Sequence, residues 1–183
     1  TAVITIDCQR GNLDPTIASL PVPEPECHRV VEATNRLLGL ARSTGIAVLH
    51  VSTVYEAPLL ANHPFERAML QAAESFTPHR QSDFARHKRP GSIEGELVPA
   101  LDVRPEDIRV DSKRTFDSFH GTPLALLLRY MRRDTLLFAG CNTNTCVLAT
   151  AFGAYNRGLR VVVVADCVAS AYGNDLHEFA LDN

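Results

Sequence analysis

Short apolar runs alternate along the chain with longer stretches in which apolar residues recur at helical spacing. The short runs cover residues 2–6, 46–54, 107–113, 135–140 and 160–166. Strands in which apolar residues do not alternate with polar ones are typical of a parallel sheet that is covered on both faces. We therefore predict five strands in a central, mostly parallel sheet.

Three segments between these strands have helical spacing, namely residues 24–43, 122–133 and 144–157. Gly45 and Gly158 follow the first and third segments, and glycine commonly ends a helix. Thr122 suits the N-cap of the second helix, and Pro123 suits its first turn. This alternation of strands and helices predicts an α/β fold, a three-layer α/β/α sandwich of Rossmann-like architecture.

A single domain is expected over residues 1–183, because no repeat or low-complexity tract divides the chain. Residues 55–90 are rich in proline, histidine and arginine and are predicted to form a long loop with one helix near residues 64–75. A loop of this length is typical of a lid or a partner surface. The missing initiator methionine before Thr1 and the incomplete helical pattern at residues 173–183 leave open a truncation at both ends and the loss of a sixth strand.

Charge and composition narrow the range of partners. The 183 residues include 18 Lys and Arg and 21 Asp and Glu, which gives a net charge of −3. This balance provides no general attraction to nucleic acid or to an anionic membrane. The longest apolar run, residues 161–165, is too short to cross a bilayer, and no signal peptide is apparent. The basic stretch at residues 86–92 is expected to be a solvated loop.

The five cysteines do not form an evenly spaced disulfide framework, which favours a reducing compartment and hence the cytoplasm. Cys8, Cys27 and Cys167 are predicted to fill the core. Cys141 and Cys146 lack a second Cys/His pair at zinc-site spacing, so a structural zinc is not expected. The chain also lacks a GxGxxG motif, a P-loop and a G-x-S-x-G elbow, which argues against the corresponding nucleotide-binding and serine hydrolase functions.

Polar residues at the strand ends are the candidates for chemistry, because ligands of doubly wound sheets bind beyond the carboxyl ends of the strands. Those residues are Asp7, Thr53, Tyr55, Lys113, the loop from Cys141 to Cys146, and Asp166. A thiol at a helix start beside a lysine is expected to have a lowered pKa and to act as a nucleophile. A nearby carboxylate can move its proton. Asp7, Lys113 and Cys146 form such a set, although each by itself also fits a turn cap, a surface lysine or a buried small residue.

Three sequence blocks resemble the isochorismatase-like cysteine hydrolases, which include nicotinamidases, N-carbamoylsarcosine amidases, biuret hydrolases and ureidoacrylate amidohydrolases. The blocks are VITIDCQRG, VDSKRTFDSFHGTPL and FAGCNTNTCVLATAFGAYNRGLRVVVVADCVAS. The resemblance implies a catalytic triad of Asp7, Lys113 and Cys146. It also implies an oxyanion hole made by the backbone N–H groups of Asn142 and Cys146, preceded by a cis peptide bond at Cys141–Asn142.

The sequence departs from nicotinamidases in the region after the second strand. The Asp-x-His metal motif is absent from VSTVYEAPLLANH, and His63 alone is a poor substitute, so we expect no metal and no cofactor. Asn142 replaces the small apolar residue that the resemblance implies there. Its side chain either reaches a substrate or braces the turn, and the sequence leaves both open. Gln9, Tyr55 and Phe119 are further substrate-binding candidates, with core packing as the alternative for the aromatic residues.

The expected function is that of a cysteine-dependent amidohydrolase. It would cleave a small amide, carbamoyl or ureido compound through a thioester and release ammonia or an amine. The alternatives are isochorismatase-type hydrolysis of another small molecule and a non-catalytic binding role. Arg and His residues at 79–89 are candidates for binding a carboxylate or ureido group, with a solvated loop as the alternative. The resemblance also implies a homodimer or homotetramer, whereas the substrate itself stays open.

Overall fold

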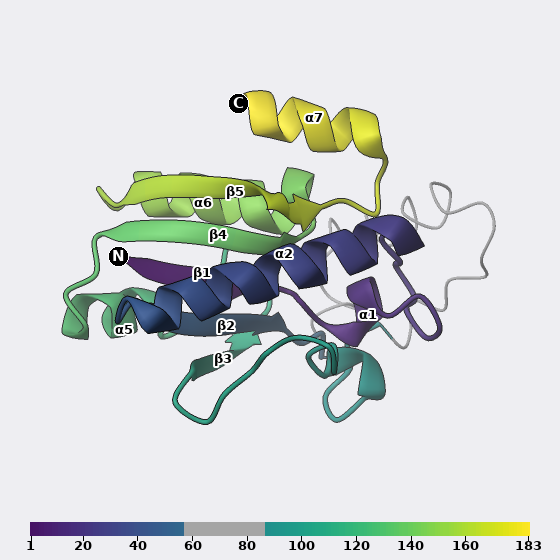
Figure 1. Cartoon of the computed structure of the whole chain (residues 1–183), viewed down its shortest axis with the longest axis horizontal. Helices are drawn as coiled ribbons and strands as arrows, with labels where there is room; N and C mark the ends of the chain where they lie inside the picture. The colour runs from purple at the N-terminus through teal and green to yellow at the C-terminus, as the bar shows by residue number, and fades with distance from the viewer. Residues whose placement is uncertain (57–86) are drawn as a thin grey trace.

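The computed structural model describes residues 1–56 and 87–183 and has one five-stranded parallel sheet at its centre (Figure 1). The strand order is β3–β2–β1–β4–β5. The strands are β1 (Ala2–Ile6), β2 (Ala47–Thr53), β3 (Ile108–Lys113), β4 (Thr135–Cys141) and β5 (Arg160–Ala169). All four neighbouring pairs are parallel, so their carboxyl ends meet at one edge of the sheet.

Helices cover both faces of the sheet and complete the predicted three-layer α/β/α architecture. The long helix α2 crosses one face, whereas α5 and α6 lie on the other (Figure 1). α7 lies beyond the β5 edge, and a π-helical turn, η2, links β4 to α6. The helices and turns are α1 (Arg10–Leu13), α2 (Glu24–Ser43), η1 (Ile93–Gly95), α5 (Leu124–Tyr130), η2 (Thr143–Val147), α6 (Leu148–Tyr155) and α7 (Asn174–Asp182).

The central strand β1 is buried along its whole length because both of its faces are covered. Ile4 and Ile6 pack into the core beneath α5 and α6, whereas Val3 packs into the core beneath α2. Burying one such side chain contributes about 1.5–3 kcal/mol relative to leaving it exposed. A continuous apolar run is therefore the pattern that a central parallel strand requires.

The strands and helices predicted within residues 1–56 and 87–183 are confirmed, with differences at α5 and β5. The helix predicted over residues 122–133 is shorter, because Arg132 adopts a positive φ of 53° and cannot continue it. Pro123, not Thr122, is the N-cap residue of α5, and Thr122 accepts a hydrogen bond from the Leu124 N–H at 3.2 Å. The predicted helix at residues 64–75 lies outside the described residues.

Strand β5 runs past Asp166 to Ala169, so the expectation that Asp166 stands at a strand end is wrong. The pairing of β4 with β5 shifts between Phe138 and Gly140, and Gly140 then pairs with Val168. This irregularity lets β5 rejoin the sheet beyond the expected end. Asp166 is exposed on the strand and does not join the other strand-end residues.

Glycine is required where β4 approaches the end of β1. Gly140 has a φ of 116°, and a Cβ at this position would lie 1.9 Å from the Ile6 carbonyl oxygen. The close approach brings the turn after β4 beside Asp7, which follows β1 with a φ of 53°. The peptide bond between Cys141 and Asn142 in this turn is cis.

None of the helices in the described part of the chain is long and apolar enough to cross a membrane.

Candidate active site

Asp7, Lys113 and Cys146 meet at the carboxyl edge of the sheet. Asp7 follows β1, Lys113 ends β3, and Cys146 lies in η2 immediately before α6. The Lys113 ammonium lies 2.7 Å from Asp7 Oδ2 and 3.2 Å from Cys146 Sγ. The three side chains are between 0% and 5% exposed, so they form a desolvated cluster in which electrostatic interactions are strong.

Thr53 completes the cluster from the end of β2. Its hydroxyl donates to Asp7 Oδ1 at 2.8 Å and accepts from the Lys113 ammonium at 2.5 Å. β2 separates β1 from β3 in the sheet, so Thr53 fills the space that the Lys113 side chain must cross to reach Asp7. We infer that Thr53 fixes the orientation of both charged groups.

The carboxylate and the ammonium of the cluster form a buried ion pair. Burial works against ionisation of Asp7, but the charges of Lys113 and Lys88 outweigh it and lower its pKa to about 2. Burial likewise disfavours the charged form of Lys113, but attraction to Asp7 and Cys146 raises its pKa. Both groups are therefore charged at neutral pH.

The expectation of a lowered pKa for Cys146 is wrong. Burial of the thiol and the negative charge of Asp7 raise the pKa of Cys146, and the nearby Lys113 only partly opposes this. The carboxylate of Asp7 favours the protonated form of the thiol. The resting state is therefore a thiol and a carboxylate that both contact the Lys113 ammonium.

The turn that carries Cys146 is braced against the end of β5 and against α7. The Asn142 amide oxygen accepts from the Ala171 N–H at 2.9 Å, and the Asn144 amide oxygen accepts from the Ser170 hydroxyl at 2.7 Å. The hydroxyl of Thr143 lies 2.8 Å from Nδ1 of His177 in α7. Of the two roles left open for the Asn142 side chain, its amide oxygen therefore performs the bracing one.

Three residues predicted to bind substrate make contacts within the protein itself. Gln9 is fully buried, and its amide donates to the carbonyls of Thr53 and Gly95 at 2.8 Å each, so it braces the site. Phe119 is 4% exposed and packs in the core under the Arg157 guanidinium. Tyr55 is partly buried, and its ring centroid lies 5.8 Å from that of His87. None of these three predictions is supported by a contact with the triad.

The prediction that the basic stretch at residues 86–92 is solvated fails for two of its residues. His87 and Lys88 are each 3% exposed. Nδ1 of His87 lies 2.5 Å from the Ser19 hydroxyl, which in turn donates to Glu94 at 2.7 Å. The residue types in this stretch indicate charge but carry no signal for burial, since the partners come from a different part of the chain.

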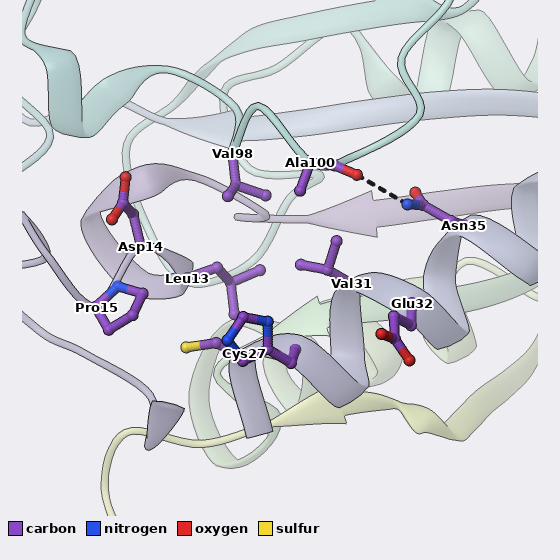
Figure 2. A pocket seen from close by; sticks show the side chains of 10 residues that line it. Leu13, Asp14, Pro15, Cys27, Val31, Glu32, Asn35, Val98 and Ala100 are labelled. Carbon is purple, nitrogen blue, oxygen red and sulfur yellow. Dashed lines mark hydrogen bonds between the residues drawn. The ribbon is translucent and has the colours of Figure 1, made fainter. Parts of the chain in front are cut away.

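A separate open hollow of about 310 Å³ lies between α1, α2 and residues 97–100. Leu13, Val31 and Val98 converge on it, and Asn35 donates to the Ala100 carbonyl at its margin (Figure 2). None of the triad residues lines this hollow. Within residues 1–56 and 87–183, no group of three or more His, Cys, Asp or Glu side chains is arranged to hold a metal ion. His63 lies outside those residues.

Cys8 and Cys27 pack in the core beneath α2, as predicted, and Cys167 packs beside Ala33 and Ala139. All five cysteines are buried, and none of them is part of a disulfide. Burial raises the pKa of Cys8 to about 12, so this neighbour of Asp7 is an inert thiol. Of the five, Cys146 is the one that lies within 3.2 Å of the Lys113 ammonium.

Comparison with known proteins agrees with the resemblance noted in the sequence. The isochorismatase domain family matches residues 1–183. The chain is 29% identical over 177 residues to the maleamate amidohydrolase of Pseudomonas putida, which covers 97% of this chain and 75% of that protein. It is 31% identical over 156 residues to a ureidoacrylate amidohydrolase of Methylorubrum extorquens, which covers 84% of this chain and 62% of that protein.

Solved structures share the fold. A cysteine hydrolase from Pseudomonas syringae superposes with a TM-score of 0.81 at 23% identity and covers 100% of this chain and 83% of its own. A pyrazinamidase of Pyrococcus horikoshii, solved in complex with zinc, gives a TM-score of 0.78 at 24% identity and covers 99% and 92% of the two chains. These likenesses support the three-layer α/β/α architecture.

Proposed function

The chain belongs to the isochorismatase family, and we propose that it is a cysteine-dependent amidohydrolase of small amide, carbamoyl or ureido compounds. The observation that carries the proposal is the buried contact of the Lys113 ammonium with both the Asp7 carboxylate and the Cys146 thiol. This arrangement places a base, a cation and a nucleophile within reach of one carbonyl group.

In the first step, Asp7 accepts the thiol proton while Cys146 Sγ attacks the carbonyl carbon of the substrate. Negative charge develops on the carbonyl oxygen, and the backbone N–H groups of Asn142 and Cys146 are proposed to bind it. Lys113 keeps Asp7 ionised before the attack and stabilises negative charge on sulfur during it. The raised pKa of Cys146 makes transfer to Asp7 necessary, because little free thiolate exists at neutral pH.

In the second step, the tetrahedral intermediate collapses and the C–N bond breaks. Asp7 returns its proton to the departing nitrogen, and ammonia or an amine leaves a thioester on Cys146. A water molecule then gives a proton to Asp7 and attacks the thioester carbonyl. Release of the acid returns the thiol to Cys146, and Asp7 is again a carboxylate.

The relatives support amide hydrolysis over the alternatives. Two of them are named for the hydrolysis of maleamate and of ureidoacrylate. Isochorismatase-type hydrolysis of another small molecule is less favoured, because that reaction has no use for a nucleophile at Cys146. A non-catalytic binding role would leave the contacts within the triad without a function.

Ammonia release tests the proposal. The assay uses a panel of biuret, carbamoyl amino acids, maleamate, ureidoacrylate and nicotinamide. We expect release from at least one of the first four compounds, and Cys146→Ser should abolish it. Cys167→Ala is the matched control, since this buried thiol packs beside Ala33 and Ala139 and has no contact with the triad. Unchanged turnover in Cys146→Ser would refute the nucleophile, whereas mass spectrometry of a trapped acyl adduct on Cys146 would support the thioester.

Two broader expectations accompany the proposed activity. We propose that the protein is a cytoplasmic homodimer or homotetramer. Exposed apolar side chains on α6 and the adjacent edge strand support association, since Phe152 is 53% and Tyr155 74% exposed. The contact surface predicted within residues 55–90 lies mostly outside the described residues. Light scattering during size-exclusion chromatography measures the oligomeric state.

A further inference from the structure

Two residues of the proposed triad, Lys113 and Cys146, come from strands that are not neighbours. Lys113 ends β3 and Cys146 follows β4, whereas β2 and β1 lie between these strands in the sheet. Strand pairing therefore does not by itself hold the Lys113 ammonium 3.2 Å from Cys146 Sγ. The segments that follow these two residues contact each other directly, through side chains that the proposed mechanism does not use.

Ser118 and Thr150 form this contact, and both are fully buried. Ser118 lies in the loop after β3, and Thr150 lies in α6, four residues beyond Cys146. The Thr150 hydroxyl donates to the Cys146 carbonyl at 2.7 Å. The same hydroxyl accepts from the Ser118 N–H at 3.0 Å, and the two hydroxyl oxygens lie 2.9 Å apart. Because a hydroxyl has one proton and two lone pairs, Thr150 can bind both residues at once.

The contact between Thr150 and Ser118 joins positions that are 32 residues apart. A threonine in a helix often donates to the carbonyl four residues before it, so the bond to Cys146 alone would not indicate a special role. Ser118 is held in turn by Thr122, whose hydroxyl donates to the Ser118 carbonyl at 2.5 Å. The loop after β3 therefore presents a fixed partner to the helix that follows the nucleophile.

A glycine allows the same loop to lie against the next turn of α6. A Cβ at Gly153 would lie 2.5 Å from Asp117 Oδ1, so a larger residue there would push the loop away. Thr150 and Gly153 are three positions apart and therefore face the same side of the helix. Phe119 of the loop belongs to the same core cluster as Cys146. Loop and helix thus pack over two turns, with the hydrogen-bonded contact at the turn nearer to Cys146.

The turn that contains Cys146 is not a regular α-helical turn. The Val147 N–H donates to the Asn142 carbonyl at 3.1 Å, a bond across five residues that is typical of the π-helical turn η2. Such turns are rare and occur mostly as single turns at functional sites. The bond from Thr150 reaches the backbone of the nucleophile itself, so it limits how far the sulfur can move.

We propose that Ser118 and Thr150 are positioning residues that align the Cys146 sulfur with the Lys113 ammonium. The inference rests on the proposed function, since attack by Cys146 is the step that needs this alignment. Thr150 acts through the Cys146 carbonyl, and Ser118 acts through Thr150. A displacement of about 1 Å in a reacting group can lower a rate by roughly 100-fold.

Removal of the Thr150 hydroxyl tests the pair in turnover. Thr150→Val keeps a β-branched side chain, and we expect it to lower kcat for ammonia release roughly 10- to 100-fold with little change in KM. Thr150→Ser keeps the hydroxyl and should restore most of kcat. Ser118→Ala keeps the N–H that donates to Thr150 and should lower kcat less than Thr150→Val does. Thr34→Val is the matched control, because Thr34 is a fully buried threonine of α2, which contains no triad residue.

The reactivity of the thiol separates alignment from a general loss of structure. The Lys113 ammonium opposes the rise in the pKa of Cys146, so a sulfur displaced from it should have a higher apparent pKa. We expect the pH dependence of alkylation by iodoacetamide to shift upward in Thr150→Val and to return to the wild-type position in Thr150→Ser. Peptide mapping by mass spectrometry assigns the rate to Cys146. A lower kcat with an unchanged or lowered apparent pKa would overturn the inference, since a loosened structure exposes the thiol to water.

Alkylation requires no turnover, so the inference and the proposed function can fail separately. An upward shift in Thr150→Val, in a protein that hydrolyses no amide of the panel, would refute the amidohydrolase and leave the alignment of Cys146 intact. Unchanged kcat in Thr150→Val would overturn the inference and leave the amidohydrolase standing. Thermal denaturation checks that each variant is folded at the assay temperature. If Thr150→Val is unfolded there, Ser118→Ala replaces it in both measurements, with the same directions expected.

Discussion

The described residues include two buried clusters that each combine a potential nucleophile, a base and a partner, and we propose catalysis for the first of them. In the first, Cys146 lies beside Lys113 and Asp7. In the second, the hydroxyl of Ser19 contacts both His87 and Glu94. A list of residue types alone would rank the second cluster higher, since serine, histidine and a carboxylate form a familiar catalytic triad.

The direction of the hydrogen bonds separates the two clusters. A catalytic serine gives its proton to histidine, and the carboxylate binds the far side of the ring. Here the Ser19 hydroxyl donates to Glu94 at 2.7 Å, so His87 does not receive the single hydroxyl proton. Nδ1 of His87 faces both Ser19 and Glu94. The second cluster therefore joins two loops, whereas for the first we propose that a proton moves from Cys146 to Asp7.

The largest expected contrast between the clusters is in turnover. Cys146→Ala should lower kcat by about 10⁴-fold or more, because the covalent step is lost. Ser19→Ala should change kcat by less than about tenfold, since the Ser19 hydroxyl contacts His87 and Glu94 rather than a residue of the triad. Steady-state ammonia release measures both. A loss in Ser19→Ala as large as that in Cys146→Ala would make the second cluster catalytic.

Stability provides the next contrast. Lys113→Met leaves Asp7 buried without its partner and should lower the free energy of unfolding by about 3–5 kcal/mol. Glu94→Gln keeps an acceptor for Ser19 and should cost about 1–3 kcal/mol. Urea denaturation measures both changes. The double variant Asp7→Asn/Lys113→Met should recover part of the loss, and strictly additive losses would contradict a coupled ion pair.

The two clusters should also lose stability in different pH ranges. Burial lowers the pKa of His87 from 6.5 to about 4, so the unfolded chain binds its proton more tightly. The contribution of His87 to the free energy of unfolding is complete above pH 6.5. It declines by about 3 kcal/mol as the pH falls to 4. The pKa of Asp7 is lowered from 3.8 to about 2, so its contribution is lost only between those values. Denaturation at stepwise pH should show the upper decline disappearing in His87→Gln, and its persistence would contradict the assignment.

The smallest expected effect concerns the reactivity of the thiol. Because burial and Asp7 raise the pKa of Cys146, its alkylation by iodoacetamide should accelerate with an apparent pKa above that of a free thiol. Asp7→Asn should lower that apparent pKa, whereas Ser19→Ala should leave it in place. Peptide mapping by mass spectrometry assigns the rate to Cys146 among the five thiols. An apparent pKa in the wild type below that of a free thiol would show that the charge of Lys113 outweighs burial.

The local pattern of apolar and polar residues was sufficient to predict most of the fold and to identify the residues of the proposed triad. The apolar run of β1 and the helical spacing of α2 predict those elements, since both depend on residues close together in the chain. Asp7, Lys113 and Cys146 were recognisable because each lies at or after the end of a predicted strand, and parallel strands end at one edge of the sheet. The same rule misplaced Asp166, because a local pattern carries no information about the shift in pairing between β4 and β5.

The properties that determine the chemistry of the candidate active site depend on contacts between segments that are far apart in the sequence. Lys113 and Asp7 are 106 positions apart, and Ser19 and Glu94 are 75 apart. Burial of Lys88, the bracing roles of Gln9 and Asn142, and the raised pKa of Cys146 all arise from such contacts. Periodicity and strand-end position are local and can be found in a sequence, whereas desolvation and the balance of charge around a group exist only once the chain has folded around it.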